Sequence, residues 1–344
     1  MGRRAHKHGT GMIYPRPIAM QDGSRPKGAY PLAGGRCWFD RVDLLERGQP
    51  SRVVPAPDLP ADVLDRLTAP RAPFAGLTLD RPRIIGIVNV TPDSFSDGGR
   101  YLDPQAALLR GQALVEEGAD VLDIGGESTR PGAAPVHDDE EIARTSPVIA
   151  ALRSGGMTTA ISIDTRKAGV ARAALAAGAD AVNDVSALTF DAALAGVVAD
   201  ARVPVILMHA QGAPATMQDD PRYDDVLLDV YDALAARVAA AEAAGIARNR
   251  IVIDPGIGFG KTGAHNLALV RGLSLFHGLG LPVMLGASRK RFIGVIGGDA
   301  DARMPGSVAV ALAGVAQGVQ MLRVHDVGAT RAALALWQAV WGGI

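Results

Sequence analysis

Short apolar runs rich in β-branched residues alternate with longer Ala- and Leu-rich stretches from Arg81 to the end of the chain. Continuous apolar runs of this kind are typical of strands that are buried on both faces of a parallel sheet. Eight runs are therefore predicted to be strands, at 83–90, 120–126, 159–164, 180–186, 204–209, 250–256, 282–288 and 320–326. The Ala- and Leu-rich stretches between most of them predict helices.

Helix signals occur in the expected places. Asp103 is a suitable N-cap, Pro104 suits the first helical position, and Gly118 is placed to end the same helix. In a later stretch, apolar residues recur at the spacing of one helix face, namely at Leu227, Val230, Tyr231, Leu234 and Val238.

An internal repeat sets the size of the repeating unit. EEGADVLDI at 116–124 resembles AAGADAVND at 176–184, and AAGIARNRIVID at 243–254 has the same order of helix end, glycine, turn and strand. Eight βα units in residues 81–344 predict an α/β fold, the (β/α)8 TIM barrel of ~250 residues. A doubly wound open sheet is the alternative, and eight strands with no large remainder favour the barrel.

The first 80 residues follow a different pattern, because ten of the 22 prolines lie before position 75. Residues 1–28 are predicted to be a disordered basic tail. Residues 29–80 are predicted to be an irregular N-terminal extension that packs on the barrel, which is assigned to residues 81–344. We expect the extension to be passive or to serve packing, so deletion of residues 1–28 should leave the kinetics intact. A regulatory or partner-binding role is the alternative.

Composition excludes some classes of function. Lys and Arg number 35 against 36 Asp and Glu, so there is no electrostatic argument for a nucleic-acid or anionic-membrane partner. Apolar runs long enough to cross a membrane, ~18 residues, do not occur in the sequence. Cys37 is the single cysteine, which precludes an intrachain disulfide and favours a reducing, cytoplasmic compartment.

Polar residues gather at the ends of the predicted strands. In strand order they are Asn89, Glu127 to Arg130, Asp164, Asn183 with Asp184, His209, Asp254, Ser288 to Lys290, and Arg323 with His325. The carboxyl ends of the strands of a TIM barrel meet at one mouth, where the active site lies. We therefore expect these side chains to form one site.

Each residue also has a structural interpretation. Asp164 suits the cap of the next helix, Asn183 and Asp184 suit turns, and Asp254 begins a common turn sequence. His209 is interpreted as a core histidine, Arg289 with Lys290 also suits a solvated pair, and Asp123 is interpreted as structural. GIGFGKT at 256–262 does not match the phosphate-binding P-loop, because Pro255 stands where that motif requires glycine.

Eight segments together resemble the dihydropteroate synthase family of folate biosynthesis. They are GIVNVTPDSFSDGG, DIGGESTRPGA, SIDT, AVNDVS, LMHAQGAPATMQ, DPGIGFGKT, GASRKRFIG and RVHDV, within residues 84–327. The resemblance implies a (β/α)8 barrel and a homodimer. It also implies that p-aminobenzoate is joined to 6-hydroxymethyl-7,8-dihydropterin pyrophosphate, giving 7,8-dihydropteroate and pyrophosphate.

The resemblance implies a role for individual residues. Those implied to bind the pterin pyrophosphate are Thr129, Asp164, Asn183, Met208, Asp254, Phe259, Lys290, Arg323 and His325. Those implied to be catalytic are Asp97, Arg130, Lys290, Arg323 and His325. Asn89 is implied to be the ligand of a Mg²⁺ cofactor, whose remaining ligands would be phosphate and water.

The resemblance implies a p-aminobenzoate pocket made by Phe95, Pro131 and Ser288, with Phe95 and Pro131 in loops that order over bound pyrophosphate. It also implies that the pterin–oxygen bond breaks before the amine attacks, so that charge stabilisation and placement supply the catalysis. One alternative is another pterin-binding barrel such as a methyltetrahydrofolate–corrinoid methyltransferase, which has no use for a pyrophosphate cluster. The other is a non-enzymatic pterin-binding relative.

Overall fold

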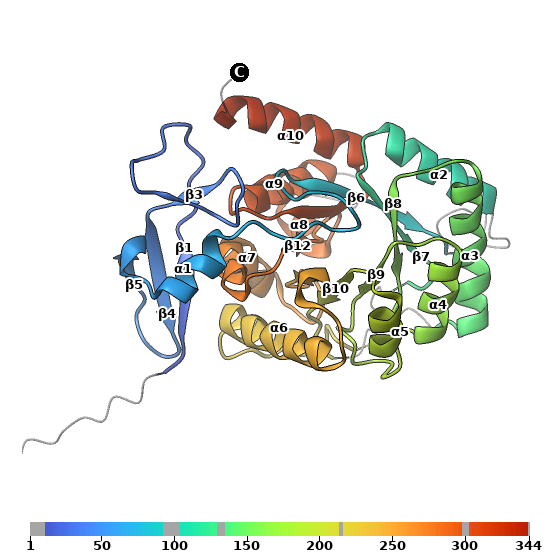
Figure 1. The fold of residues 1–344 in the computed structure, drawn as a ribbon, viewed down its shortest axis with the longest axis horizontal. Coiled ribbons are helices and arrows are strands. Elements are labelled where there is room, and N and C mark those ends of the chain that lie inside the picture. The colour runs from blue at the N-terminus through green and yellow to red at the C-terminus, as the bar shows by residue number, and fades with distance from the viewer. Residues whose placement is uncertain (1–10, 92–103, 129–134, 213–215, 298–302, 343–344) are drawn as a thin grey trace, which may run out of the picture.

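The computed structural model describes residues 11–91, 104–128, 135–212, 216–297 and 303–342 (Figure 1). Its eight parallel strands are β6 (Arg83–Asn89), β7 (Val121–Gly125), β8 (Ala160–Asp164), β9 (Ala181–Asp184), β10 (Val205–Met208), β11 (Ile251–Asp254), β12 (Met284–Leu285) and β13 (Met321–Val324). They pair in the order β11-β10-β9-β8-β7-β6-β13-β12, and a parallel bridge between Ile253 and Val283 joins the two outer strands. The predicted (β/α)8 barrel is confirmed.

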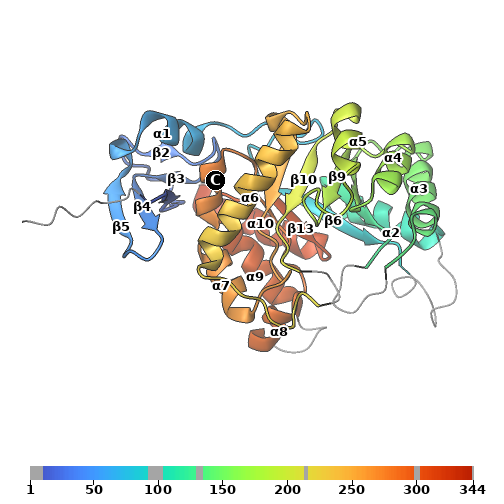
Figure 2. The ribbon, with the colours of Figure 1, turned by 90° about the horizontal axis from the view of Figure 1, so that it is seen from below.

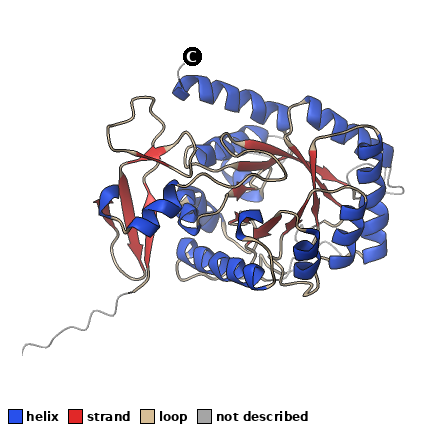
Figure 3. Cartoon of the chain, viewed as in Figure 1, coloured by secondary structure: helices blue, strands red, loops and turns tan. Residues whose placement is uncertain are grey.

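Helices surround this sheet on its outside, as Figure 3 shows. They are α2 (Pro104–Glu116), α3 (Asp138–Ser154), α4 (Ala168–Ala176), α5 (Leu194–Ala201), α6 (Val226–Ala243), α7 (Gly263–Arg271), α8 (Arg291–Gly297), α9 (Arg303–Val315) and α10 (Val327–Gly342), with the 3-10 helices η2 (Arg248–Arg250) and η3 (Leu273–Leu279). The apolar face predicted for α6 packs into the core, with Leu227 at its half-buried edge. No helix within the described ranges is long and apolar enough to cross a membrane.

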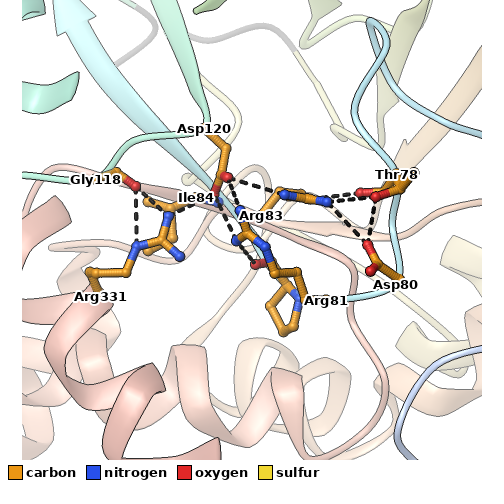
Figure 4. A network of polar contacts seen from close by, with 9 residues as sticks. Thr78, Asp80, Arg81, Arg83, Ile84, Gly118, Asp120 and Arg331 are labelled. Carbon is orange, nitrogen blue, oxygen red and sulfur yellow. Dashed lines mark hydrogen bonds and ion pairs between the residues drawn. The ribbon is translucent and has the colours of Figure 1, made fainter.

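The internal repeat corresponds to a repeated hydrogen-bonding device at the amino ends of the strands. Asp120 Oδ2 accepts a hydrogen bond from Ile84 N (2.9 Å), and Asp180 Oδ2 accepts one from Ile161 N (2.8 Å). In both copies an arginine binds the carboxylate and the carbonyl of the glycine two residues before it. Arg331 does so at Gly118 and Asp120 (Figure 4), and Arg153 does so at Gly178 and Asp180. Each device ties one strand to its neighbour, at the end of the barrel where residues serve stability.

The N-terminal extension is folded, and the prediction of an irregular segment was wrong. It contains β1 (Ile13–Pro17), β2 (Tyr30–Pro31), β3 (Trp38–Phe39), β4 (Arg41–Glu46), β5 (Arg52–Pro55), η1 (Ala56–Asp58) and α1 (Ala61–Thr68). Strands β1, β4 and β5 form an antiparallel sheet with β1 at one edge. The predicted disordered tail over residues 1–28 was therefore also wrong for β1, whereas residues 1–10 lie outside the described part.

The extension is anchored on the barrel by buried contacts. Tyr14 is 2% exposed, its ring meets that of Tyr231 on α6 edge to face, and its hydroxyl donates to Asp232 (2.8 Å). Ser274 Oγ in η3 donates to the Pro17 carbonyl (2.7 Å). Because these contacts bury apolar surface and satisfy polar groups, the extension is a structural part of the domain.

A short segment between the extension and β6 closes the amino end of the barrel. Phe74 and Leu79 are buried among inward-facing apolar residues of the strands. This apolar layer consists of Ile85, Val121, Ala160, Ala181, Ile206, Val252, Met284 and Met321. The half of the barrel at the amino ends of the strands is therefore a filled core, and any ligand has to enter from the carboxyl ends.

Candidate active site

The alternation of side chains along a strand explains why the site is polar. Residues two apart point to the same side of a strand, so the positions after the apolar layer also face the barrel interior. On β7 these positions are Asp123 and Gly125, after Val121. The same step on the other strands brings inward Ser162 and Asp164, Asn183, Met208, Asp254, Gly286 and Ser288, and Arg323 and His325. A polar layer thus lies directly above the apolar one.

A cavity of about 1040 Å³ opens at this end of the barrel. Seven of the predicted residues line this cavity. They lie at or shortly after the carboxyl ends of strands and are Asn89, Asp164, Phe259, Ser288, Lys290, Arg323 and His325. Figure 2 shows α8, which follows β12, on the lower side of the molecule and α1 of the extension on the upper side. The volume is sufficient for a small organic ligand.

Asp123 is the most connected residue of the polar layer. It has no exposed surface, and its Oδ1 accepts a hydrogen bond from Ser162 Oγ (2.5 Å). Its Oδ2 accepts hydrogen bonds from Asn183 Nδ2 (3.0 Å) and from Arg323 Nε (2.6 Å). Asp123, interpreted from the sequence as structural, contacts two of the predicted site residues, Asn183 and Arg323.

Arg323 also binds Asp164, with Nη2 2.7 Å from Asp164 Oδ2. Burial raises the pKa of Asp164 to about 7, and the charge of Asp123 acts in the same direction, while Arg323 opposes both. Burial of Arg323 lowers its pKa, but the charges of Asp123 and Asp164 outweigh this effect and raise the pKa above its ordinary value. The guanidinium is therefore a permanent cation held between two strands.

Asp254, Asn183 and Met208 form the floor under the cavity and do not line its open part, since their exposed fractions are 2%, 2% and 4%. Asp254 Oδ1 accepts a hydrogen bond from Gly256 N (2.7 Å), and burial raises the pKa of Asp254 to about 6. A Cβ on Gly286 would lie 3.3 Å from Asp254 Oδ2. Glycine at position 286 therefore keeps space beside this carboxylate.

Two pairs of residues line the wall formed after β11, β12 and β13. The ammonium of Lys290 lies 4.0 Å from the centre of the Phe259 ring, which is cation–π geometry. His325 Nδ1 lies 3.0 Å from Ser288 Oγ. Burial lowers the pKa of His325 to about 3, with Arg323 adding to the effect, so this imidazole is neutral at pH 7 in the ligand-free site.

The buried Lys261 and the half-buried His209 form a pair that the sequence did not suggest. Lys261 Nζ lies 2.9 Å from His209 Nδ1 and donates to the Phe259 carbonyl (2.9 Å). A Cβ on Gly256 would collide with the His209 carbonyl, so glycine there allows the loop after β11 to lie against β10. The glycines of GIGFGKT therefore serve close packing between two strand ends.

A second buried network joins Glu127, after β7, to Val136 and to the residues before α4. Glu127 accepts hydrogen bonds from Val136 N (3.1 Å) and Arg166 Nε (3.1 Å). Lys167 Nζ donates to the Val136 carbonyl (2.6 Å) and to Glu141 (2.6 Å). Glu127 was noted in the sequence, but the bond to a backbone amide nine residues away is a tertiary contact that no motif reveals.

The donor set can be compared with the needs of a magnesium ion. Within the described ranges, no group of three or more His, Cys, Asp and Glu side chains could hold a metal. Asn89 ends β6 and contributes one amide group to the cavity. Because Mg²⁺ commonly keeps several waters and takes phosphate oxygens, a single protein oxygen at the cavity wall fits such an ion.

Five predicted site residues lie outside the described residues. They are Phe95, Asp97, Thr129, Arg130 and Pro131. The adjoining described residues, Thr91 and Ser128, both line the cavity, so the two segments start at the mouth.

Comparison with known proteins gives the same family throughout. The family model "Pterin binding enzyme" matches residues 85–325. Dihydropteroate synthase of Neisseria meningitidis serogroup B is 51% identical over 269 residues, which are 76% of this chain and 94% of that protein. The Escherichia coli K12 enzyme is 42% identical over 264 residues, with 76% and 93% covered.

Solved structures agree with this result. Dihydropteroate synthase of Xanthomonas albilineans with 4-aminobenzoic acid is 51% identical, with a TM-score of 0.74 over 80% of this chain and 99% of that one. The same enzyme in complex with 7,8-dihydropteroate is 48% identical, with a TM-score of 0.72 over 80% and 100%.

Proposed function

Because this chain belongs to the pterin-binding enzyme family, with dihydropteroate synthases as its relatives, we propose that it catalyses the dihydropteroate synthase reaction. In this reaction p-aminobenzoate displaces pyrophosphate from 6-hydroxymethyl-7,8-dihydropterin pyrophosphate. The observation that carries the proposal is the buried polar layer, in which Arg323 joins two carboxylates beside Asn183 and Asp254. A flat heterocycle with several hydrogen-bonding groups requires such an arrangement.

We assign recognition of the pterin to Asp164, Asn183, Asp254 and Lys290. A pterin carries N–H donors and ring acceptors side by side, which carboxylate, amide and ammonium groups can match. An unmatched buried polar atom costs about 1–3 kcal/mol, so the floor should reject rings that lack these groups. Arg323 can stack its guanidinium on the ring, and Phe259 and Met208 supply apolar contacts.

The chemical step exchanges a C–O bond for a C–N bond. The bond from the pterin methylene to the pyrophosphate oxygen breaks, and pyrophosphate leaves with the electron pair. The aryl amine then donates its lone pair to the cationic methylene and forms the C–N bond, and the resulting ammonium group passes one proton to water or to the released pyrophosphate. The neighbouring carboxylates Asp164 and Asp254 favour positive charge on the pterin, which is the charge that develops in this step.

The leaving group requires positive charge and hydrogen-bond donors. We assign Arg323, His325, Arg130 and Thr129 to the pyrophosphate, of which Arg323 and His325 line the cavity. Asn89 would hold Mg²⁺, which when bound would neutralise part of the pyrophosphate charge. Asp97 is assigned to support of the metal or of the cationic methylene.

We assign p-aminobenzoate to the part of the mouth between Ser288 and the segments that contain Phe95 and Pro131. Ser288 is 7% exposed and lines the cavity beside His325. An aryl amine is already a competent nucleophile, so the requirement on this pocket is placement of the nitrogen near the methylene.

We also propose a homodimer and a cytoplasmic location. Leu336, Val340 and Trp341 on α10 are exposed by 69%, 66% and 39%. Exposed apolar surface of this kind marks association sites. The double substitution L336E/V340E should convert a dimer into a monomer in light scattering, whereas Val53→Glu on the extension should not. A monomeric wild-type protein would contradict the dimer.

The function is tested by incubating the protein with dihydropterin pyrophosphate, p-aminobenzoate and Mg²⁺ and by measuring both products. Equal amounts of 7,8-dihydropteroate and pyrophosphate are expected. Arg130→Ala should reduce turnover much more than it weakens binding of a pterin without pyrophosphate. Absence of product with all three components present would reject the proposed activity.

A further inference from the structure

The orientation of the Asn183 amide is determined by its neighbour. Arg323 is a donor without acceptor atoms, so Asp123 Oδ2 acts as an acceptor where Arg323 Nε meets it. The group of Asn183 that faces the same oxygen must then be its NH₂, which lies at 3.0 Å. Asn183 Oδ1 is consequently turned the other way.

That oxygen has no partner within the described part of the chain. Asn183 is 2% exposed, and Oδ1 is buried without a hydrogen bond there. A buried acceptor without a donor costs about 1–3 kcal/mol. A ligand that presents an N–H group to Asn183 would remove this cost, whereas a ligand that presents a carbonyl would add a repulsive contact.

The same carboxylate also orients Arg323. Asp123 on β7 takes Nε and Asp164 on β8 takes Nη2, so two neighbouring strands fix the plane of the guanidinium. Without Asp123 the guanidinium would retain one of these two carboxylates and could rotate about that contact.

We infer that Asp123 is a positioning residue for the proposed synthase, because it fixes the Asn183 amide and the Arg323 guanidinium and so selects a ligand with an N–H group facing Asn183. This inference rests on the proposed function. It assigns to Asp123 a role through Asn183 and Arg323, with no direct contact to substrate.

Asp123→Leu tests the inference with a side chain of the same branching and no acceptor atom. Neither methyl group can accept from Asn183 or Arg323, so the Asn183 amide becomes free to turn over. We expect kcat/KM for dihydropterin pyrophosphate to fall about 100-fold, as for loss of a charged hydrogen-bond acceptor. The preference for binding pterin over lumazine, which carries a carbonyl in place of the 2-amino group, should fall about tenfold.

Ser162→Ala is the matched control. Ser162 is fully buried and bonds the other oxygen of Asp123, so the variant loses a hydrogen bond at the same carboxylate but leaves Asn183 and Arg323 in place. Its kcat/KM and its pterin-to-lumazine preference should stay within threefold of wild type. The preference is a ratio of affinities, so it does not depend on the folded fraction.

An unchanged preference in Asp123→Leu, or equal losses of kcat/KM in Asp123→Leu and Ser162→Ala, would overturn the inference. If Asp123→Leu yields no folded protein, Asp123→Glu carries the same test, since its longer side chain displaces the oxygen and should also lower the preference. A wild-type protein that forms dihydropteroate while Asp123→Leu keeps its ligand preference would reject this inference alone. A wild-type protein without product would reject the proposed function.

Discussion

Lys261 Nζ lies 2.9 Å from His209 Nδ1, so a buried amine joins the loop after β11 to the end of β10. Burial lowers the pKa of Lys261 to about 7 from an ordinary 10.5, with Lys290 adding to the effect and Asp254 opposing it. Burial likewise lowers the pKa of His209 to about 3, so His209 stays neutral at pH 7. The pair should therefore give stability a pH dependence of its own.

Between pH 7 and 10 the unfolded chain binds a proton at Lys261 that the folded chain has lost. The free energy of unfolding of the wild type should therefore rise with pH relative to that of Lys261→Met, by at most about 1.4 kcal/mol per pH unit. Urea denaturation of both proteins at pH 7, 8 and 9 measures the difference. Parallel curves for the two proteins would show that Lys261 titrates normally.

Asp254→Asn should raise the stability of the protein at neutral pH although it weakens pterin binding. Burial raises the pKa of Asp254 to about 6 from 3.8, so its charge costs stability above pH 6 and costs none below pH 3.8. The variant should be more stable than the wild type at pH 7.5, by on the order of 2 kcal/mol, and the gain should vanish near pH 4. Thermal unfolding at both pH values tests this gain.

The same variant should bind pterin more weakly, because an amide replaces an acceptor-only carboxylate. Calorimetric titration with pterin at pH 7.5 measures the loss, and Asp200→Asn, a substitution on the outer helix α5, serves as the control. Unchanged pterin affinity would remove Asp254 from the ligand site.

Deletion of residues 1–28 should destabilise the protein, whereas a disordered tail, as the sequence predicted, would contribute nothing to stability. The deletion removes β1, including Tyr14, whose ring is in the core beside Tyr231. Loss of a large buried aromatic typically costs about 3–5 kcal/mol. A chain that starts at Gly11 retains every described contact and is the matched comparison. Equal melting temperatures of the two truncated chains would contradict the anchoring role of β1.

Phe74→Ala should lower stability by about 3–5 kcal/mol while leaving KM for both substrates unchanged in the folded protein. Phe74 is 1% exposed and belongs to the apolar layer at the closed end, away from the cavity residues. Val53→Ala, at a position that is 54% exposed, is the control and should change stability by less than about 0.5 kcal/mol. A large increase in KM would show that the two ends of the barrel are coupled.

The barrel could be predicted because each strand carries its own signal and the units repeat. The shortest strand was predicted least well, since residues 282–288 were expected and the structure has Met284–Leu285. The chain leaves the sheet at Gly286, next to Asp254. A local apolar run does not reveal such a departure, which depends on the neighbouring strand.

The extension was missed for a physical reason. The sequence of β1 is IYPRP, and proline within a strand argues against a strand because it cannot donate a ladder hydrogen bond. Here β1 is an edge strand paired only with β4 within the described sheet, so Pro15 and Pro17 are tolerated. The pattern of one segment cannot show whether it lies at an edge.

Several of the polar strand ends line one cavity, whereas Asp123 was interpreted as structural because it lies earlier than the end of its strand. The internal repeat contained the missing signal, since Asp123 in EEGADVLDI occupies the place of Asn183 in AAGADAVND. Equivalent positions in two βα units point to the same interior. By contrast, the pairing of Lys261 with His209 joins two segments 52 residues apart and required the structure.

The short strand β12 gives the barrel a seam. Two residue pairs hold it to β13 and a single bridge at Val283 holds it to β11. Amide protons along this line should exchange with deuterium sooner than those of the long pair β6 and β7. Asp254 lies on β11, on one side of the seam, and Lys290 follows β12, on the other side. A heterocycle bound to both residues would link the two strands. Hydrogen exchange along the seam should therefore slow when this ligand binds, before any product forms.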